Sequence, residues 1–547
     1  MSWESLNSQH EYVSSRLGGP MALGLAHQLS ATRLLSSPDV SRCRMDDEIW
    51  PPWSDSCSSL HREAYAEVRG VMGSPPPRRD TLACGGCFRA CRARIHQSIA
   101  KRKIDQGLRL YNQHKQQQAV RKWKSALKAI RKREDKFGLL GYLYQAYMDW
   151  GKYRDALEYA HRQLCISEEL NSSNLRAESD LNIARAHQRL GALERALTFS
   201  RQSLYNDPSQ HGTAGHVHLT VGSVYVELAG FNKALDSFQL AHRIAQAVHD
   251  PALELQVYVG LSELFSRLQD ADKSAKYASK AYDLSRSLQL GDLNSRHHRA
   301  ALLQMASALR KQGELGDAHD YCSEATRLAL VSGDQATYAR SIRIMGDIYR
   351  KRQDINKAFR QYETAMGSAA AMGDRVIQME SMDGAARCLE ALRLQHKICN
   401  CRPLEFNTRL LEVASSVGAK LLVLKIRIRL SRIYHALGDE DQRLHHERVA
   451  FRVQEELKLQ CGGCGSPYGI ENDSLEALPC AHILHARCAY DLFRRSKKKM
   501  RSCPECDRTS SRLYLNCNDY NMTYSPVPLS ICSSDSHCTS HQATSSV

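Results

Sequence analysis

The chain has 547 residues, with 75 lysines and arginines against 59 aspartates and glutamates, which gives a formal net charge of +16. It is too long for a single hydrophobic core, and a composition of 42% hydrophobic and 24% charged residues is ordinary for a water-soluble protein. No run of 18 apolar residues occurs, which argues against a transmembrane helix, and we expect no secretory signal. Nineteen cysteines without a regular disulfide framework favour the cytosol.

The basic charge does not by itself indicate a nucleic-acid-binding protein. Lysines and arginines are spread along the whole chain, and no nucleic-acid-binding motif or row of stacking aromatic residues accompanies them. We therefore expect no nucleic-acid partner and favour an acidic protein partner or an anionic membrane surface. No paired carboxylates, Ser/His/Asp set or phosphate-binding loop stands out, so we predict no catalytic residues and no organic cofactor.

Residues 1–94 lack hydrophobic periodicity and are rich in Ser, Pro and Arg, which predicts a disordered N-terminal extension. Near its end Cys84, Cys87 and Cys91 precede a basic stretch that runs to Lys103. Acylation of such cysteines, together with the attraction of the basic stretch to anionic lipids, would attach the chain to a membrane. The same cysteines could equally be unmodified thiols, and the sequence leaves both interpretations open.

Residues 95–438 repeat a pattern of small, large and aromatic positions. Two sets share the same offsets: Gly222, Tyr225, Ala234, Phe238 and Ala241, and Gly346, Tyr349, Ala358, Tyr362 and Ala365. Weaker copies begin at Gly107, Tyr144, Ala184, Ser262 and Ala306. This is the tetratricopeptide pattern, with a spacing of about 40 residues instead of the usual ~34. It predicts an all-α superhelix whose concave surface suits an extended or helical peptide.

The repeat pattern weakens near its end. We interpret residues 399–403, which carry Cys399 and Cys401, as a loop insertion with idle thiols; a metal or redox pair is the alternative. Residues 420–432 alternate like a strand, but the repeat context favours a helix. Their basic residues form either the solvated tips of a buried helix or a contact face for an acidic partner helix; they are Lys420, Lys425, Arg427, Arg429 and Arg432. A charged connecting helix is predicted over residues 439–460.

Residues 461–508 contain eight cysteines and histidines in an order that predicts two zinc ions. The order is Cys461, Cys464, Cys480, His482, His485, Cys488, Cys503 and Cys506, with two residues inside each outer pair. A segment this short has little apolar surface to bury, so metal binding must supply most of its folding energy, about 10–16 kcal/mol for a small zinc peptide. Residues 509–547 are predicted to be a flexible tail.

The order of three cysteines, two histidines and three cysteines resembles a RING-H2 finger. That resemblance implies one site made of Cys461, Cys464, His485 and Cys488. It implies a second site made of Cys480, His482, Cys503 and Cys506.

The combination of long tetratricopeptide-like repeats, a charged helix and a terminal RING-H2 finger resembles the rapsyn family, from about Ile104 to Arg508. The resemblance implies a cytoplasmic scaffold that self-associates and clusters nicotinic acetylcholine receptors at the postsynaptic membrane. It implies that repeats near Leu404–Leu430 contact the intracellular helix of the receptor, and that the RING binds a dystroglycan-type cytoskeletal partner. Members usually begin Met-Gly and are myristoylated, whereas this chain begins Met1-Ser2. Two explanations stay open: Cys84, Cys87 and Cys91 substitute for the myristoyl group, or another transcript start exists.

The alternative function is a RING-type ubiquitin or ubiquitin-like ligase with the repeats as a substrate-binding arm. A RING has no nucleophile of its own and grips a conjugating E2 enzyme, usually through an apolar residue between its first two ligands. Gly462 and Gly463 occupy that position here and offer no side chain. Whether the chain is an enzyme therefore stays open at this point.

Overall fold

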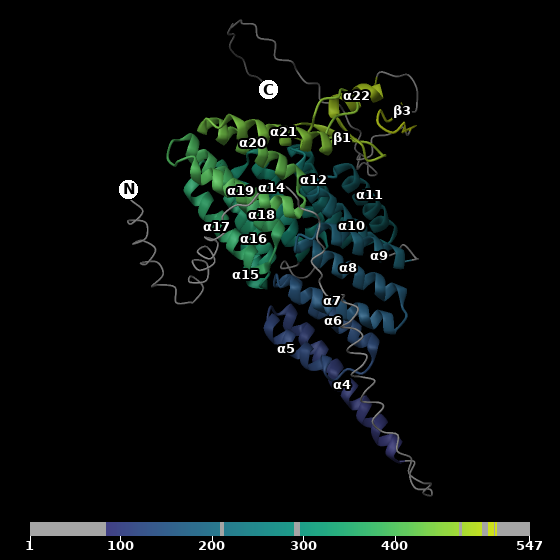
Figure 1. Cartoon of the computed structure of the whole chain (residues 1–547). Helices are drawn as coiled ribbons and strands as arrows, with labels where there is room; N and C mark the ends of the chain where they lie inside the picture. The colour runs from purple at the N-terminus through teal and green to yellow at the C-terminus, as the bar shows by residue number, and fades with distance from the viewer. Residues whose placement is uncertain are drawn as a thin grey trace, which may run out of the picture. The chain divides into compact units, whose positions relative to one another are not determined.

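The structure is a computed structural model, and it describes residues 84–207, 213–288, 296–469, 473–494, 501–507 and 509–510. Residues 81–547 cluster into one compact unit. Its helices run in chain order along one solenoid (Figure 1): α4 (Cys84–Asn112), α5 (Gln116–Leu127), α6 (Arg133–Asp149), α7 (Tyr153–Glu169), α8 (Ser173–Arg189), α9 (Leu193–Asn206), α10 (Thr213–Glu227), α11 (Phe231–Ala247), α12 (Pro251–Arg267), α13 (Ala271–Ser287), α14 (Arg296–Gln312), α15 (Leu315–Ser332), α16 (Gln335–Lys351), α17 (Ile355–Met372), α18 (Arg375–Leu394), α19 (Cys401–Val417), α20 (Lys420–Leu437) and α21 (Glu440–Leu457).

Each helix packs on the next one along the chain, so the predicted all-α superhelix of tetratricopeptide type is confirmed. The predicted small positions are where helices approach most closely. A Cβ at Gly222 would lie 2.6 Å from the ring of Phe238, and one at Gly346 would lie 2.9 Å from the ring of Tyr362. Because both rings are fully buried, each glycine is required by the neighbouring aromatic side chain.

The helix ends follow from short polar residues and glycine. The carboxylates of Asp250, Asp270 and Asp334 accept hydrogen bonds from backbone N–H groups in the first turns of α12, α13 and α16. Gly333 and Gly373 end α15 and α17 in the left-handed conformation, which other residues adopt at a cost. These signals place the turns between successive helices of the solenoid.

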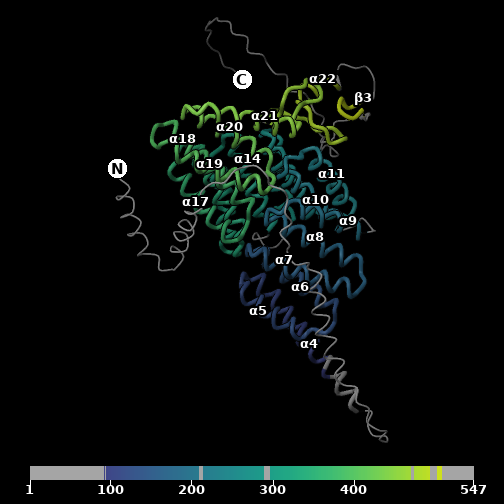
Figure 2. The backbone as a smooth tube through the Cα atoms, in the orientation of Figure 1, coloured from purple at the N-terminus to yellow at the C-terminus, as the bar shows by residue number. Residues whose placement is uncertain are grey.

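The solenoid winds far enough for repeats remote in sequence to touch, as the backbone trace shows (Figure 2). Gly151, after α6, lies against Met372 at the end of α17. The hydroxyl of Tyr153 donates a hydrogen bond of 3.2 Å to Asp374, a residue 221 positions later. Gly191 lies against Arg375 in the same way. The early and late repeats therefore contact and stabilise each other across one turn of the superhelix.

A small module follows α21. Strand β1 (Leu475–Ala477) pairs antiparallel with β2 (Ile483–His485), so that Glu476 lies opposite Leu484. Helix α22 (Ala486–Arg494) follows, and β3 (Arg501–Ser502) pairs with β4 (Thr509–Ser510). The described residues of the module thus form two short two-stranded sheets and one helix.

Two details bear on the predicted domain boundaries. Helix α4 begins at Cys84, so residues 84–94, which the sequence placed in the extension, belong to the first helix of the solenoid. Residues 1–83 and the tail beyond Ser510 lie outside the described residues, and their predicted disorder is left as a prediction. The segment from Lys420 is helical, as the repeat context predicted, and not a strand.

Candidate metal centre and its docking surface

The eight predicted ligands come together as two separate groups of four. Cys461, Cys464, His485 and Cys488 form one group, and Cys480, His482, Cys503 and Cys506 form the other. In each group one potential ligand atom per residue lies within 4.8 Å of all the others. Four thiol and imidazole donors at this separation are the set that a tetrahedral zinc site requires. Both groups could therefore hold a metal ion.

The two outer Cys-x2-Cys pairs form turns of the same kind. The N–H of Gly465 donates to the carbonyl of Cys461 at 2.7 Å, and the N–H of Asp507 donates to the carbonyl of Cys503 at 2.9 Å. Gly465 and Asp507 both have positive φ angles, of 74° and 53°. Each turn therefore directs two sulfur atoms to the same side of the chain. Sequence spacing predicted the pairs, but the left-handed Asp507 had no sequence signal.

Further contacts orient the ligands. In the first group, the Sγ of Cys464 lies 3.3 Å from the Nδ1 of His485, and the N–H of His485 points at the Sγ of Cys461. In the second group, the Nδ1 of His482 lies 3.4 Å from the Sγ of Cys480, and its Nε2 lies 3.4 Å from a carboxylate oxygen of Glu505. A carboxylate on the second imidazole nitrogen is a common support for a metal-binding histidine.

The thiols differ in how easily they ionise. Hydrogen bonds from Ser466 and from His485 lower the pKa of Cys464 to about 6. Burial, followed by the neighbouring thiols, raises the pKa of Cys488 to about 12. A divalent cation reverses this preference, since a coordinated thiol binds as the thiolate. The thiol and imidazole donors of the site thus fit a cation such as zinc. Because sulfur atoms such as that of Cys503 are buried, folding of the module would depend on a bound cation.

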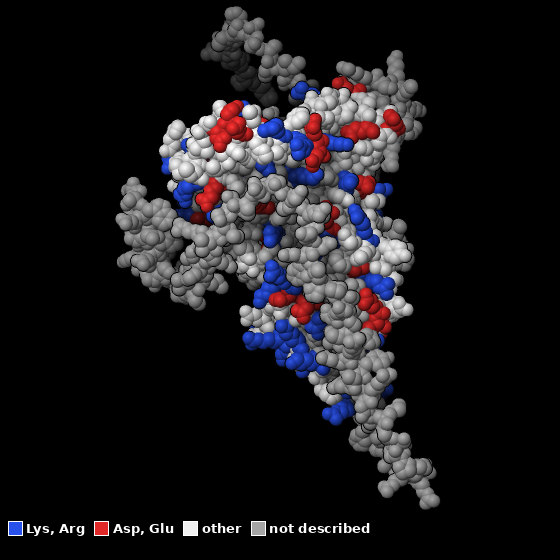
Figure 3. Space-filling model, in the orientation of Figure 1, with Lys and Arg blue, Asp and Glu red and all other residues white. Residues whose placement is uncertain are grey.

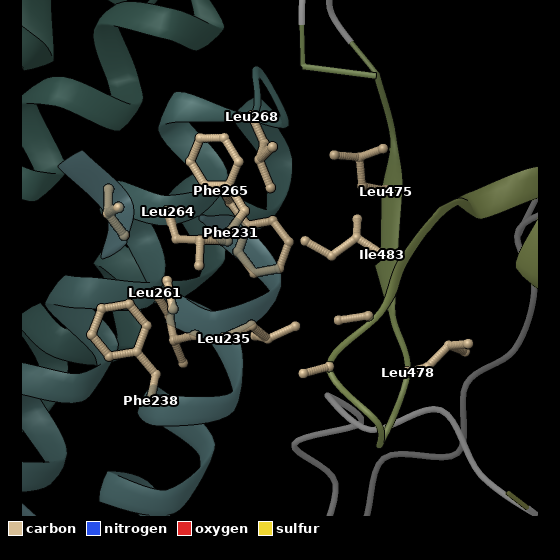
Figure 4. Close-up of a cluster of buried hydrophobic side chains, with 14 of the residues drawn as sticks. Phe231, Leu235, Phe238, Leu261, Leu264, Phe265, Leu268, Leu475, Leu478 and Ile483 are labelled. Atoms are coloured by element: carbon tan, nitrogen blue, oxygen red, sulfur yellow. The ribbon is translucent and has the colours of Figure 1, made fainter. Parts of the chain in front are cut away.

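The module is attached to the solenoid through its hairpin. Leu475 and Ile483 are fully buried. Their side chains point toward Phe231 and Leu235 of α11 and toward Leu268 in the turn after α12 (Figure 4). They belong to a single apolar cluster that continues into the core of the solenoid. Within the module α22 packs on both strands, and the solenoid supplies the further apolar surface that covers this short hairpin.

Polar contacts fix the hairpin in register. The N–H of Leu475 donates a hydrogen bond of 2.9 Å to the carboxylate of Asp270, which also caps α13. The ammonium of Lys273 donates to the carbonyl of Leu475 and lies 2.5 Å from the carboxylate of Glu476. Sequence analysis did not predict this docking surface. Its only signal was the apolar character of residues 475–484, which does not identify what covers them.

The basic residues of α20 do not form one face. Arg429 is largely buried in an ion pair of 2.7 Å with Asp383 of α18. Lys425 is half-buried near the same carboxylate, and burial, followed by neighbouring arginines, lowers its pKa to about 8. On the opposite side, Lys420 pairs with Glu456 of α21.

The remaining two basic residues of α20 are placed differently. The Nη1 of Arg427 lies 3.0 Å from the Nδ1 of His446, which, like Glu456, belongs to α21. Arg432 is exposed. The structure therefore separates the predicted contact residues: Arg429 and Lys425 face the interior, Lys420 and Arg427 face the next helix, and Arg432 faces solvent.

The predicted lipidation sites lie at the start of the first helix. Cys84, Cys87 and Cys91 have their backbone in the first turns of α4, and their acylation is still a prediction. Cys399 and Cys401 are exposed free thiols beside the start of α19, outside both ligand groups. Among the described helices, none is both long and apolar enough to cross a bilayer.

Comparisons with known proteins identify the family of the chain. Residues 95–174 match the family description "Rapsyn N-terminal myristoylation and linker region". The 43 kDa receptor-associated protein of the synapse from Tetronarce californica is 30% identical over 418 residues, covering 76% of this chain and 98% of that protein. The chain belongs to the rapsyn family. The Gallus gallus protein of the same name is also 30% identical, over 420 residues and 98% of its length.

Solved structures of other helical proteins show more distant likeness. A Rap protein complexed with competence and sporulation factor is 14% identical, with a TM-score of 0.44, and covers 66% of this chain and 99% of that one. A Rap conjugation gene regulator of the plasmid pLS20, in complex with the Phr* peptide, is 14% identical with a TM-score of 0.42, covering 66% and 96%.

Proposed function

We propose that this rapsyn-family protein is a cytoplasmic scaffold that self-associates and clusters nicotinic acetylcholine receptors at the postsynaptic membrane. The single observation that carries the proposal is the match to the Tetronarce californica receptor-associated protein over 98% of its length. The protein would then hold a receptor through its late repeats and a cytoskeletal partner of dystroglycan type through its module.

The position of the module supports a scaffold role. Because the hairpin shares an apolar cluster with α11 and α12, the two candidate binding parts keep a fixed separation. A rigid connection lets one chain impose a defined geometry on two partners. A flexible linker would only raise their local concentration.

Charge supports attachment to the membrane surface. Residues 101–135, in α4, α5 and the start of α6, contain twelve lysines and arginines but only three acidic residues. Lys and Arg side chains gather over α5 in the space-filling view (Figure 3). Such a surface is attracted to anionic lipids by about 1 kcal/mol for each basic residue near the bilayer. We propose peripheral attachment at the cytoplasmic face, with acylation of Cys84, Cys87 or Cys91 as a second anchor.

The receptor contact is tested best at an exposed residue of α20. Arg432→Glu should reduce co-purification of the tagged full-length chain with a nicotinic receptor from cells that express both. Arg360→Glu, on the exposed side of α17, is the matched control and should have no effect. If both variants co-purify with the receptor as well as the unmodified chain does, Arg432 is not part of the proposed contact. If none of the three chains co-purifies with the receptor, the receptor-binding proposal is contradicted.

The alternative function, a RING-type ligase, rests on the two groups of four ligands, because they are arranged as in a RING-H2 finger. The site lacks a side chain for gripping an E2 enzyme at Gly462, where an added Cβ would lie 2.7 Å from Glu505. Tyr490 of α22 is 49% exposed and is the large apolar side chain that could serve instead. Discharge of a loaded E2 enzyme by the full chain, abolished by Tyr490→Ala, would favour this second function.

A further inference from the structure

A cavity of about 380 Å³ lies inside the superhelix. Its lining comes mainly from the first helix of successive repeats: α6, α8, α10, α12, α14, α16 and α18. Binding pockets for ligands commonly have volumes of about 300–1,000 Å³. The cavity is therefore large enough to receive several groups of a bound molecule, and it lies apart from the metal sites and from the exposed end of α20.

One half of the cavity is crowded with arginines. Arg185 and Arg189 come from α8, Arg296 begins α14, and Arg340 lies on α16. Burial, followed by the influence of Arg296 and Arg189, lowers the pKa of Arg185. Four guanidinium groups from three repeats thus converge on one space, although like charges repel and burial penalises them.

The carboxylates in that half are already engaged. Asp149 accepts hydrogen bonds from Tyr111 and Gln145 and pairs with Arg296 at 3.0 Å. Asp334 pairs with Arg299 at 2.8 Å and caps α16 through the N–H and hydroxyl of Thr337. Neither carboxylate neutralises the arginines that remain.

Three of the arginines consequently lack an acidic partner. Within the part of the chain that the structure describes, no carboxylate lies at ion-pair distance from Arg185, Arg189 or Arg340. Electrostatic interactions link Glu178 with Arg185 and Asp374 with Arg189. In each pair, however, the charged groups are farther apart than ion-pair distance.

The other half of the cavity differs in charge. There Arg267 pairs with Glu227, Glu263 and Glu380, and Arg343 pairs with Glu380. Acidic groups outnumber arginines among these residues, so the unsatisfied positive charge is confined to one end. A ligand that uses it must present negative charge at that end only.

We propose that the cavity binds an acidic, extended peptide segment of a partner protein, with its carboxylates on Arg185, Arg189 and Arg340. Guanidinium groups pair with carboxylates through two parallel hydrogen bonds, and such bonds strengthen where water is excluded. Helices of the superhelix surround the cavity, and its arginines would select acidic side chains. This site is separate from the receptor contact, and it does not depend on the proposed function.

The test uses the full chain and a fluorescein-labelled peptide of eight glutamates, with an eight-glutamine peptide as the ligand control. Fluorescence anisotropy should detect binding of the glutamate peptide only. The double variant Arg189→Gln, Arg340→Gln should weaken it at least tenfold, since it removes the charge-assisted hydrogen bonds of two guanidinium groups. The matched control is Arg201→Gln, Arg360→Gln, which removes the same charge from exposed positions on α9 and α17 and should weaken binding less than twofold.

Folding and specificity are checked in the same experiment. Because Arg189 and Arg340 have no carboxylate partner, their removal should leave the thermal unfolding midpoint unchanged or raise it. Equal weakening in the cavity variant and the control variant would overturn the proposal, because binding would then reflect overall charge. Equally tight binding of a single-stranded oligonucleotide of the same charge, lost in the same variant, would also overturn the assignment to a peptide.

Discussion

Glycines that face aromatic rings are the residues on which the packing of the solenoid depends most closely. Gly346 of α16 and Gly384 of α18 lie on two sides of the Tyr362 ring, whose hydroxyl donates to Asp347 at 2.6 Å. Tyr362 therefore joins three successive helices through one fully buried side chain. The repeat pattern predicted Gly346 and Tyr362 but not the hydrogen bond to Asp347, because its register did not include that position.

Alanine at Gly384 should destabilise the chain. The added Cβ would lie 2.2 Å from the Tyr362 ring, and overpacking of a core costs about 1–3 kcal/mol. Gly367→Ala, in α17, is the control because a Cβ there meets no atom within 4 Å. It should stabilise by about 0.5–1 kcal/mol, since alanine favours a helix. Urea denaturation of both variants measures the difference, and equal stabilities would contradict this packing.

Asp383 should make stability depend on acid pH. Although burial raises its pKa, Arg387 and Arg429 together lower it to about 2, below the ordinary value of about 3.9. A lowered pKa in the folded state contributes stability above about pH 4, and the contribution is lost as the pH falls toward 2. Asp383→Asn should cost on the order of 3 kcal/mol at pH 7, because it leaves the largely buried Arg429 without its ion-pair partner.

The check on Asp383 is urea denaturation at pH 7 and pH 3. The difference between the variant and the unmodified chain should shrink at pH 3. A difference that does not change with pH would mean that folding does not lower the pKa of Asp383. Arg429 belongs to this pair, which explains why a basic residue singled out as a partner contact instead stabilises the interior.

At the scale of elements, the hairpin β1–β2 connects the module to the tip of α12 and α13. Asp270 has two roles there, since one carboxylate oxygen caps α13 and the other accepts the N–H of Leu475. Asp354 caps α17 in the same way but has no contact with the module. The two aspartates thus separate the effect of a helix cap from the effect of docking.

Asp270→Ala should loosen the hairpin, whereas Asp354→Ala should not. Both variants lose a helix cap, at a cost of about 1 kcal/mol. Only the first also loses a hydrogen bond to a charged acceptor, about 1.5–3 kcal/mol, so the amide of Leu475 should exchange with solvent roughly tenfold faster or more. Hydrogen exchange resolves this amide, and unchanged protection in Asp270→Ala would contradict the docking.

Sequence reasoning succeeded where the signal was local and failed where it was not. Helices were predictable from periodic small and aromatic positions, and the eight ligands from Cys461 to Cys506 were predictable from their spacing. Their division into two groups of four came from the resemblance to a RING-H2 finger. The docking of Leu475 on Phe231 was not, because an apolar residue does not identify a partner that lies 244 positions away in the sequence. The same limit applied to the arginine cavity, since Arg185 and Arg340 come together only after the superhelix turns.

On the scale of the whole molecule, the hairpin depends on the metal sites, whereas the solenoid depends on neither. The metal is proposed to fold the module, the folded module presents the hairpin, and the hairpin covers Phe231 and Leu235. The solenoid has its own core and its own contacts between distant repeats, such as Tyr153 with Asp374. Loss of metal should therefore unfold the module and leave the solenoid folded.

Cys480→Ser should release bound zinc and expose the apolar surface that the hairpin covers. We expect metal analysis to give two zinc ions per unmodified chain, fewer in the variant, and an increase in the fluorescence of a hydrophobic dye. The helical circular dichroism signal should persist. Cys401→Ser, an exposed thiol outside both groups, should retain all the zinc. Full retention by Cys480→Ser would contradict the ligand assignment.

The central claim, that this chain clusters receptors, is tested most directly by imaging. A tagged full-length chain is expressed in a non-muscle cell, alone and together with a nicotinic acetylcholine receptor. The proposed function predicts puncta at the plasma membrane that recruit the receptor. A diffuse protein together with an evenly spread receptor would contradict it.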